Sequence, residues 1–398
     1  MEETRIDNLL VISPHYHTFI KGLTNACARY ARNIDVFVHH NHLSEIARFL
    51  PSTPRISWIR KFSKDSLIDS TNIPDNVKCD IESMLYFVPD GWNQTLGRKI
   101  ASKIEKSINK SSMKPDVIHS HFILPCGQAG AELKNRIQKP LIVTGHGHDV
   151  YEMPFRDDEW RHRVKEVLDS ADHIIVVSIL NRERILQIKG NAKISVIPNG
   201  CQIKQFHPMD KSHCRKTLKI QSDTNMLLTV GNLSAVKGHV YLIRALKEIS
   251  DIIKKRIDCY IIGDGIMRKE LLNLVRDEDL DDIVHFMGDI SHDKIPLWMN
   301  ASDVFVLPSL NEGNPTVLFE CLGCGTPFIG TRVGGIPEII QSDQYGLLCN
   351  PGDSSGLAKS ISIALNRDWD RDSIAIYGRQ FDWSNIAGRM MHIYEEFA

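Results

Sequence analysis

Two glutamates near residue 316 are the side chains of this sequence best suited to chemistry. Glu312 lies in the polar loop that follows an apolar run, Val304–Leu307, and Glu320 comes after seven intervening residues, inside an apolar helical stretch. A carboxylate among apolar neighbours needs a hydrogen-bond partner, which a hydroxyl-rich ligand can supply. From spacing alone, Glu320 could equally reach solvent.

The residues between these glutamates predict the start of a helix that can bind an anion. Asparagine is a favoured N-cap and proline a favoured first residue, so we expect Asn314 to cap a helix that begins at Pro315. The free amides around Thr316 and Val317 would then point at the edge of the sheet and attract a negatively charged group. Gly313 stands in the loop before this helix.

A lysine lies in a second loop of the same kind. Lys237 precedes Gly238 after the apolar run Met226–Val230, at the entrance of a helical pattern that begins near His239. There it can reach an anion that the helix N-terminus also favours, although a solvated surface lysine fits equally well. The turn Gly263–Gly265 is not GxGxxG, and no Walker A sequence occurs, which weakens a dehydrogenase or P-loop interpretation.

Histidines end two strands that we predict in the first half of the chain. His119 and His121 alternate on one strand, so their imidazoles share a face, as in metal-dependent hydrolases; His146 ends the next strand. Further ligands are not evident at neighbouring strand ends, so we prefer no metal site. The single CxxC, Cys321–Cys324, lies in an apolar helix without a second pair, which favours small core residues over zinc.

The elements that must position these residues follow a βα rhythm. Short apolar runs alternate with helical stretches, and the rhythm restarts after the turn Ile197–Gly200. Two parallel sheets in two α/β domains explain this better than one sheet, and we place the boundary near residue 206. The runs that predict strands are Leu9–Ser13, Asp35–Val38, Val117–His121, Leu141–Thr144, His173–Ser178, Met226–Val230, Tyr260–Ile262, Val284–Met287, Val304–Leu307 and Phe328–Thr331.

Two further segments of the first half need an interpretation. Residues 51–93 show no clean period, and we interpret them as an insertion or rim of the first domain. The helix expected at Arg98–Lys110 has an isoleucine face flanked by lysines. We prefer a core-packed helix with a solvated basic face, and contact with an anionic membrane surface is the alternative.

Composition excludes several classes of protein. The 398 residues indicate two to three domains, and 48 Lys and Arg against 49 Asp and Glu give a net charge of −1. That balance argues against a protein that holds nucleic acid by bulk phosphate neutralisation. Nine scattered cysteines, and a charged start without a long apolar run, favour a reducing, cytoplasmic location.

Taken together, the motifs resemble those of the retaining glycosyltransferases of family 4 over almost the whole chain. The family signature is a pair of glutamates separated by seven residues, which Glu312 and Glu320 match. The other matching motifs are Val230–Leu233 with Lys237–Gly238, Ile197–Gly200, Thr144–Gly147, Val333–Glu338 and the final segment Phe381–Ala387. The resemblance implies the GT-B fold, in which two Rossmann-like domains, here 1–205 and 206–382, face each other across a cleft. A last helix, 383–398, would cross back to the first domain.

The resemblance also implies a role for each candidate residue. The second domain would hold a nucleoside-diphosphate sugar, with Lys237 neutralising the diphosphate. Glu320 would accept hydrogen bonds from the ribose, Glu312 would bind and orient the sugar, and His146 would lie near the sugar that is transferred. The turn ending at Ile290 would meet the base. The expected catalytic residues are Glu312, His146 and Lys237, and the expected donor-binding residues are Asn232, Lys237, Gly313, Asn314, Pro315, Thr316, Val317, Glu320 and Ile290.

Two departures from the family pattern concern the donor phosphates. Asn232 stands where many members have an arginine, so one charge is missing from the phosphate clamp, and binding would depend more on Lys237. The loop after the first strand, Ser13–Gly22, lacks the double glycine common at that point. It could offer a histidine or Lys21 to the phosphates instead.

The implied reaction moves a hexose-type sugar to an acceptor hydroxyl with retention of configuration and without a metal or cofactor. The expected partners are a nucleotide sugar and a glycan or lipid-linked acceptor, as in polysaccharide biosynthesis, and no nucleic acid. The alternative interpretation of Arg98–Lys110 is a peripheral membrane contact, which would add the inner face of the membrane to the expected cytoplasmic location. Two other functions stay open: a sugar-nucleotide epimerase of the same fold, and a non-catalytic partner subunit of a glycosyltransferase.

Overall fold

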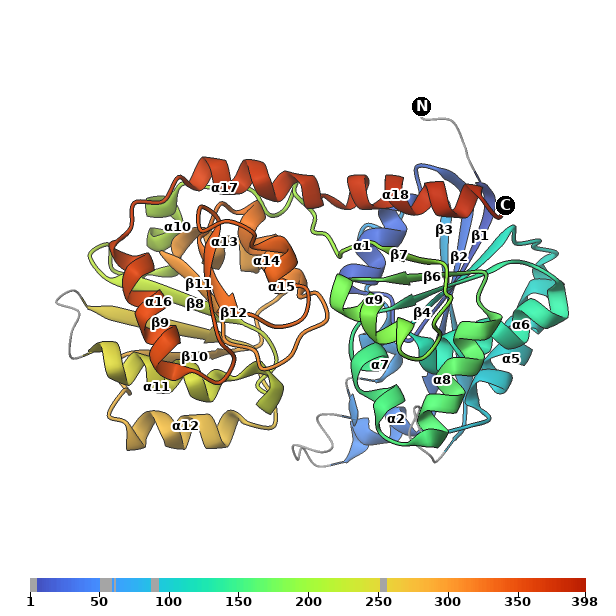
Figure 1. The fold of residues 1–398 in the computed structure, drawn as a ribbon, viewed down its shortest axis with the longest axis horizontal. Coiled ribbons are helices and arrows are strands. Elements are labelled where there is room, and N and C mark those ends of the chain that lie inside the picture. Colours follow the sequence, from blue (N-terminus) through green and yellow to red (C-terminus); the bar gives the residue numbers. More distant parts are fainter. Residues whose placement is uncertain (1–5, 51–58, 61, 87–92, 251–255) are drawn as a thin grey trace. The chain divides into compact units, whose positions relative to one another are not determined.

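The chain folds into two compact units (Figure 1). The computed structural model describes residues 6–50, 59–60, 62–86, 93–250 and 256–398. Unit 1 comprises Met1–Asn199 with Trp383–Ala398, and unit 2 comprises Gly200–Asp382. The sequence placed the boundary near residue 206, but Phe206 is already buried in the core of unit 2. The amide of Cys201 also donates to the carbonyl of Phe381 over 3.0 Å, which ties the two ends of unit 2 together.

Unit 1 is built on a parallel sheet in the order β3-β2-β1-β4-β5-β6-β7. The strands are β1 (Ile6–Ser13), β2 (Ala31–Asn41), β3 (Val77–Met84), β4 (Val117–His121), β5 (Leu141–Gly145), β6 (His173–Val176) and β7 (Ile194–Val196). The helices and turns are α1 (Thr18–Cys27), α2 (Leu43–Ile46), η1 (Ala47–Phe49), α4 (Lys64–Leu67), α5 (Leu96–Ser111), η3 (Ile123–Gly127), α6 (Gln128–Ile137), α7 (His148–Tyr151), η4 (Met153–Phe155), α8 (Asp158–Ser170), α9 (Ile179–Leu186) and α18 (Trp383–Glu395).

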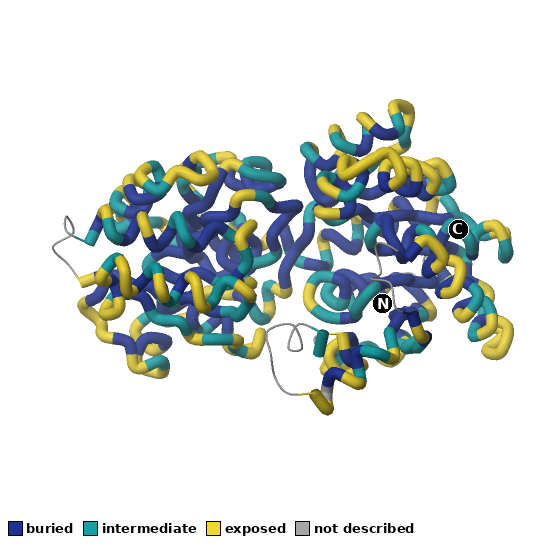
Figure 2. Tube along the Cα trace, turned by 90° about the horizontal axis from the view of Figure 1, so that it is seen from below, coloured by how far each residue is buried: buried dark blue, intermediate teal, exposed yellow. Residues whose placement is uncertain are grey.

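Both faces of this sheet are buried, because successive residues of a strand point to opposite faces. On β1, Leu9 and Val11 join one core, whereas Leu10 and Ile12 join the other. A strand buried on both faces reads as a continuous apolar run, which is why β1 was recognisable in the sequence. In Figure 2 the buried trace runs through the middle of each unit and the exposed residues lie on its outside.

The last helix, α18, belongs to the core of unit 1. Trp383 and Tyr394 are buried in the same cluster as Ile20 of α1. A Cβ on Gly22 would lie 2.3 Å from Nε1 of Trp383, so only a glycine permits this approach of α1 to α18.

The interpretation of residues 51–93 as an irregular insertion was wrong for part of that range. Residues 51–58, 61 and 87–92 lie outside the described residues, but the remainder contains α4 and the edge strand β3. Polar Lys78, Asp80 and Glu82 alternate with less polar residues along β3, which is the period of a half-covered strand. We missed this signal because an edge strand lacks the continuous apolar run of a central strand.

Unit 2 is built on a second parallel sheet in the order β10-β9-β8-β11-β12-β13. The strands are β8 (Asn225–Val230), β9 (Ile257–Ile262), β10 (Val284–Gly288), β11 (Val304–Leu307), β12 (Phe328–Thr331) and β13 (Gly346–Cys349). The helices and turns are α10 (Lys211–Leu218), η5 (Ala235–Lys237), α11 (His239–Ser250), α12 (Arg268–Asp277), η6 (His292–Lys294), α13 (Ile295–Ala301), α14 (Thr316–Gly323), α15 (Ile336–Ile339), α16 (Ser354–Asn366), α17 (Arg371–Gly378) and η7 (Arg379–Phe381).

Helices cover both faces of this second sheet as well (Figure 1). On β8, Leu228 packs into one core and Leu227 into the other. The sequence did not predict the short strands β7 and β13. Among the described residues, no helix has both the length and the apolar character needed to cross a membrane.

Candidate active site

The candidate site of unit 2 is formed by loops that follow neighbouring strands. In a parallel sheet the carboxyl ends of the strands share one edge, and β11 lies between β8 and β12. The loop after β8 meets the loop after β11, because the amide of Leu310 donates to the carbonyl of Val236 over 2.7 Å. The amide of Gly335, after β12, donates to the carbonyl of Gly313 over 2.9 Å. Backbone hydrogen bonds thus fix all three loops relative to one another.

Two glycines permit this close contact of loops. Gly238 has a φ of +67°, and a Cβ on it would lie 2.0 Å from the carbonyl oxygen of Pro308. Gly334 has a φ of +52°, and a Cβ on it would lie 1.8 Å from the carbonyl oxygen of Glu312. Any larger residue would both strain the backbone and push the loops apart.

Lys237 and Glu312 form an ion pair at the centre of these loops. Nζ of Lys237 donates to Oε1 of Glu312 over 2.6 Å, and the hydroxyl of Ser309 donates to the same oxygen over 2.7 Å. Ser309 is fully buried, and its carbonyl accepts a hydrogen bond from Thr331 of β12. An ammonium group has three donors, and the contact with Glu312 uses one, so Lys237 can also bind a second anion.

Helix α14 begins beside this ion pair. Pro315 has an extended backbone at the N-cap position, so the first helical residue is Thr316, one later than the sequence predicted; Asn314 therefore lies outside the helix. Pro315 itself provides no side-chain hydrogen bond to cap this helix end. The first amides of an α-helix have no partner within the helix, and they carry its partial positive charge. The amides at Thr316 and Val317 thus suit an anion, as expected from the sequence.

Glu320, one turn further along α14, is buried rather than solvated. Its side chain accepts a hydrogen bond from Nε2 of His292 over 2.8 Å, and only 6% of the residue is exposed. Sequence reasoning missed His292, which lies in η6 after β10 and packs against the ring of Phe206. The signal was available, because a carboxylate on an apolar helix requires a partner. Ile290 precedes η6. It is partly buried and packs against the core of unit 2 that contains Phe206.

Asn232 is exposed in the loop after β8, and it carries no charge that could assist Lys237. The structure therefore brings together, in unit 2, the predicted residues Lys237 and Glu312 with the N-terminus of α14. It places His146 in unit 1.

In unit 1, His146 follows β5 in a loop fixed by a buried carboxylate. Asp149 accepts hydrogen bonds from the amides of His146 over 3.0 Å, Gly147 over 2.9 Å and Ile123 over 3.0 Å. Burial raises the pKa of Asp149, and these amide hydrogen bonds oppose that rise. The backbone at His146 is thus held rigidly at the carboxyl edge of the sheet.

The side chain of His146 lies in a cluster of rings. Its Nε2 is 3.1 Å from Nδ1 of His121, and its ring centroid is 4.8 Å from that of Phe19 and 4.6 Å from that of Phe122. His121 in turn lies against His119, with ring centroids 4.2 Å apart. The HxH pair therefore contacts His146, an arrangement that the sequence did not predict.

These imidazoles are held in the neutral form. Burial lowers the pKa of His119 to about 3, with a further contribution from repulsion by His146. Burial also lowers the pKa of His15 to about 3, followed by repulsion from His17, whose ring stacks on it at 3.9 Å. The pKa values of His121 and His146 are lowered for the same reasons. No group of three or more potential metal ligands occurs among the described residues.

Lys21 is already engaged within unit 1. Its ammonium lies 2.7 Å from the Asp69 carboxylate and 2.9 Å from the Thr71 hydroxyl. The expectation that Lys21 reaches donor phosphates therefore requires that this ion pair be broken or shared.

Comparison with known proteins matches this geometry to a family. A model of the group 1 glycosyl transferases matches residues 210–381, and a model of glycosyltransferase family 4 matches residues 74–205. The chain is also 32% identical over 306 residues, 75% of each chain, to TuaC of Bacillus subtilis, a protein named for teichuronic acid biosynthesis. The chain belongs to the family 4 glycosyltransferases.

Solved structures place this family 4 glycosyltransferase in the GT-B fold. Sucrose-phosphate synthase from Thermosynechococcus elongatus is similar with a TM-score of 0.77 at 23% identity, over 98% of each chain. HepE of Anabaena, solved in complex with UDP, is similar with a TM-score of 0.74 at 20% identity, over 98% of this chain and 100% of HepE. Two Rossmann-like units with a returning C-terminal helix were expected, and the fold confirms them.

Proposed function

We propose that this glycosyltransferase moves a hexose-type sugar from a nucleoside diphosphate to an acceptor hydroxyl, with retention at the anomeric carbon. The observation that carries the proposal is the Lys237–Glu312 pair beside the open N-terminus of α14. A cation, aimed amides and an acid within one set of bonded loops suit a ligand that joins a diphosphate to hydroxyl groups. HepE, solved with UDP and with UDP-glucose, shares the fold, which supports this class of donor.

The charge of each group suggests which part of the donor it would bind. Lys237 and the amides at Thr316 and Val317 would bind the diphosphate, and Glu312 would accept hydrogen bonds from the sugar. Glu320 would exchange His292 for ribose hydroxyls, since His292 is half exposed and can move aside. Ile290 would contact the base. The exposed Asn232 adds no charge, so the diphosphate would depend mainly on Lys237.

In the proposed reaction the main task of the protein is to stabilise the leaving diphosphate. A nucleophilic side chain is less important. The bond from the anomeric carbon to the diphosphate oxygen breaks, and a bond from the acceptor oxygen forms on the same face. The acceptor proton passes to the departing phosphate. Lys237 and the helix amides stabilise the negative charge that grows on the diphosphate, so no divalent metal is required. The neutral imidazole of His146 would hydrogen-bond a sugar hydroxyl.

We propose a glycan or a lipid-linked sugar as the acceptor, in the biosynthesis of a polysaccharide on the cytoplasmic side of the membrane. TuaC, named for teichuronic acid biosynthesis, supports this context.

A donor screen tests the proposal. Purified protein would be incubated with common nucleotide sugars, with and without EDTA, and free nucleoside diphosphate would be measured. We expect release from one donor, undiminished by EDTA, lowered about 1000-fold in Lys237→Ala and unchanged in the surface control Lys269→Ala. NMR of the product would show the retained anomeric configuration. No binding or turnover of any nucleotide sugar would overturn the proposal, and an altered nucleotide sugar without transfer would identify an epimerase.

A further inference from the structure

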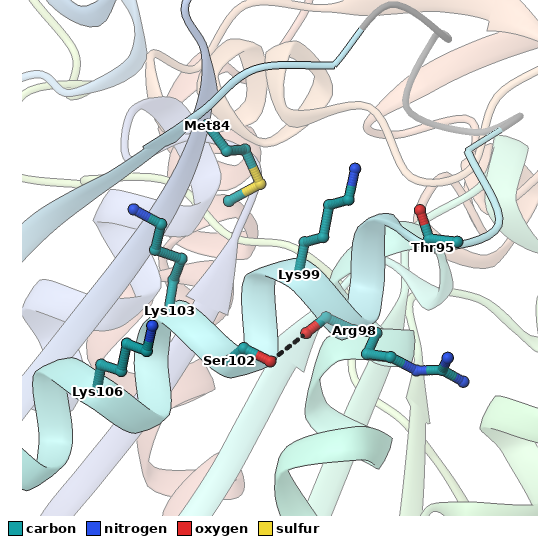
Figure 3. A pocket seen from close by; sticks show the side chains of 7 residues that line it. All are labelled: Met84, Thr95, Arg98, Lys99, Ser102, Lys103 and Lys106. Atoms are coloured by element: carbon teal, nitrogen blue, oxygen red, sulfur yellow. Dashed lines mark hydrogen bonds between the residues drawn. The ribbon is translucent and has the colours of Figure 1, made fainter.

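A groove of about 480 Å³ runs along α5 of unit 1, and most of the side chains that line it are cations (Figure 3). Lys99, Lys103 and Lys106 follow one another at one-turn spacing, so they share one face of the helix. Figure 3 shows Lys99 and Lys103 on either side of Met84, which lies at the end of β3. The groove therefore combines a row of lysines with an apolar floor.

The acidic side chains near this row have other partners, and one of them, Glu82 of β3, accepts a hydrogen bond from the Ser107 hydroxyl of α5 over 2.6 Å. Glu105 of α5 accepts a hydrogen bond from Arg136 over 2.9 Å, and Glu132 lies 3.5 Å from Arg98. Figure 3 shows Arg98 pointing away from the three lysines. Within the described part of the chain, no ion pair involves Lys99, Lys103 or Lys106. Three lysines without counter-ions on one face create a local positive potential, although the whole chain is almost neutral.

Exposed apolar side chains lie on the turn after β2 and at the end of β3. Phe49 of η1 is 88% exposed and Ile46 of α2 is 55% exposed, and Leu50 follows them in the chain. Leu85, directly after Met84, is 53% exposed. Exposed apolar residues that occur singly are ordinary, but several on one short stretch indicate a surface that is covered in use.

Hydrogen bonds join the start of this apolar turn to the residues at the end of β3. The amide of His42, just before α2, donates to the carbonyl of Met84 over 3.0 Å. Nδ2 of Asn41 donates to the carbonyl of Tyr86 over 2.8 Å. At about 1.5 to 2 Å per residue, the path from His42 to Phe49 spans only about 10 to 15 Å.

Arg60 also fixes the shape of the turn. Its guanidinium donates to the carbonyl of Ala47 over 3.0 Å and to that of Leu50 over 2.6 Å. These carbonyls belong to the turn that carries Phe49, so the phenyl ring projects from an anchored segment. Ser44 adds a hydrogen bond to the carbonyl of Phe62 over 2.8 Å.

We propose that this face of unit 1, the lysine row of α5 with the apolar turn at Ile46–Leu50, docks on the surface of an anionic lipid bilayer. Lysines would sit among acidic headgroups while Phe49 and Ile46 enter the boundary with the acyl chains. A soluble polyanion would satisfy the lysines but leave the apolar side chains in water, so the bilayer accounts for both features.

Vesicle co-sedimentation tests the proposal with the full chain and without any donor or acceptor, so its outcome is separate from that of the proposed function. The vesicles would contain phosphatidylcholine alone or mixed with phosphatidylglycerol. Salt would be raised from about 0.1 M to about 1 M, where the Debye length falls from about 10 Å to about 3 Å. We expect binding only to the anionic vesicles, and strong loss of binding at high salt.

Substitutions then locate the contact. K99A/K103A/K106A should lower the vesicle association constant about 100-fold, since each lysine near an anionic surface contributes roughly a factor of 5. Its matched control is K216A/K269A/K359A, three exposed lysines of unit 2, which removes the same charge. Phe49→Ser should lower binding about 10-fold, and its control is Ile376→Ser, at an exposed isoleucine of unit 2. Circular dichroism would verify the fold of each variant.

Several outcomes would overturn the proposal. Wild-type protein that does not sediment with anionic vesicles contradicts it directly. Equal losses in the unit 1 and unit 2 lysine triples would show binding by general charge. Binding unaffected by Phe49→Ser but competed by a soluble anionic polysaccharide would assign the groove to a polyanion instead.

Discussion

The two sheets end in two very different edges. In unit 2 the loops after the strands hold the oppositely charged Lys237 and Glu312 in contact, and a hydrogen bond joins His292 to Glu320. In unit 1 the corresponding edge holds neutral rings, with His121 and His146 in contact beside Phe19 and Phe122. Similar βα architecture therefore presents a charged surface in one unit and an uncharged, aromatic one in the other.

The difference follows from how each edge is solvated. Lys237 keeps a partly exposed side chain beside Glu312. His119 and His121 are almost fully buried, and burial favours the neutral imidazole. The charged edge suits a diphosphate, and the neutral edge suits hydroxyl groups and the faces of sugar rings. The following predictions test that contrast.

The largest effect should come from Lys237→Ala. Loss of the cation that we propose to face the leaving diphosphate should lower kcat/KM about 1000-fold, comparable to the loss of one oxyanion donor. Steady-state release of nucleoside diphosphate measures this, with Lys269→Ala as the control. A tenfold effect or less would mean that the charged edge does not drive the reaction.

Gly334→Ala should have the next largest effect. A Cβ would overlap the carbonyl of Glu312 and occupy a left-handed backbone, so the Glu312 loop must shift. Because a misplacement of about 1 Å can cost 100-fold in rate, we expect a loss of that order in kcat/KM. Gly190→Ala is the matched control, since a Cβ there meets nothing within 4 Å and Gly190 lies on the surface of unit 1. Equal activity of the two variants would contradict the proposed contact.

Acidification should destabilise unit 1 more than unit 2. The pKa of His119 is about 3 in the folded chain against 6.5 in the unfolded one, so the unfolded state binds more protons between these values. Its contribution to stability is complete above pH 6.5 and falls by about 1.4 kcal/mol per pH unit below it. His15 adds to this loss, whereas in unit 2 His239, with a pKa of about 4, gives a smaller one.

Hydrogen exchange can separate the two units in this experiment. Between pH 7 and pH 5, corrected for intrinsic exchange, amides of β4 and β5 should lose more protection than those of β8 and β11. Equal losses in both sheets would show that the imidazole cluster is not the source of acid sensitivity. His119→Gln should reduce the difference between the sheets.

The smallest effect should come from His292→Ala. His292 is half exposed, and a pair of this kind contributes at most about 1 kcal/mol. We expect the KM for the donor to change by less than about fivefold, with kcat unchanged. Glu320→Ala should raise KM more strongly, because ribose hydroxyls would lose their acceptor. A variant of His292 that was as impaired as one of Glu320 would show that the pair acts as a unit.

The strands that are buried on both faces could be predicted from the sequence, because such strands are continuous apolar runs. It did not reveal β3, which lies at the edge, or β7 and β13, which are only a few residues long. A hydrophobic pattern reports burial, and these strands are only partly buried.

For the site, sequence spacing placed Lys237, Glu312 and the helix near Thr316 on the same edge. Contacts between loops could not be predicted from the sequence, because pairs such as Glu320 with His292 depend on the order of the strands in the sheet. The ring cluster around His146 was missed for the same reason: β1 lies beside β4 in the sheet, although β2 and β3 separate these two strands in the chain.

The returning helix α18 has a consequence for synthesis. Seven buried residues of α18, among them Trp383, Met390 and Tyr394, belong to a core whose remaining buried members come from residues 6–197. Unit 2 lies between these parts, so its whole sequence leaves the ribosome before unit 1 has its last core residues. The unit that is translated first is therefore completed second, and until then its α1 face and His119, the partner of the Tyr394 hydroxyl, stay uncovered.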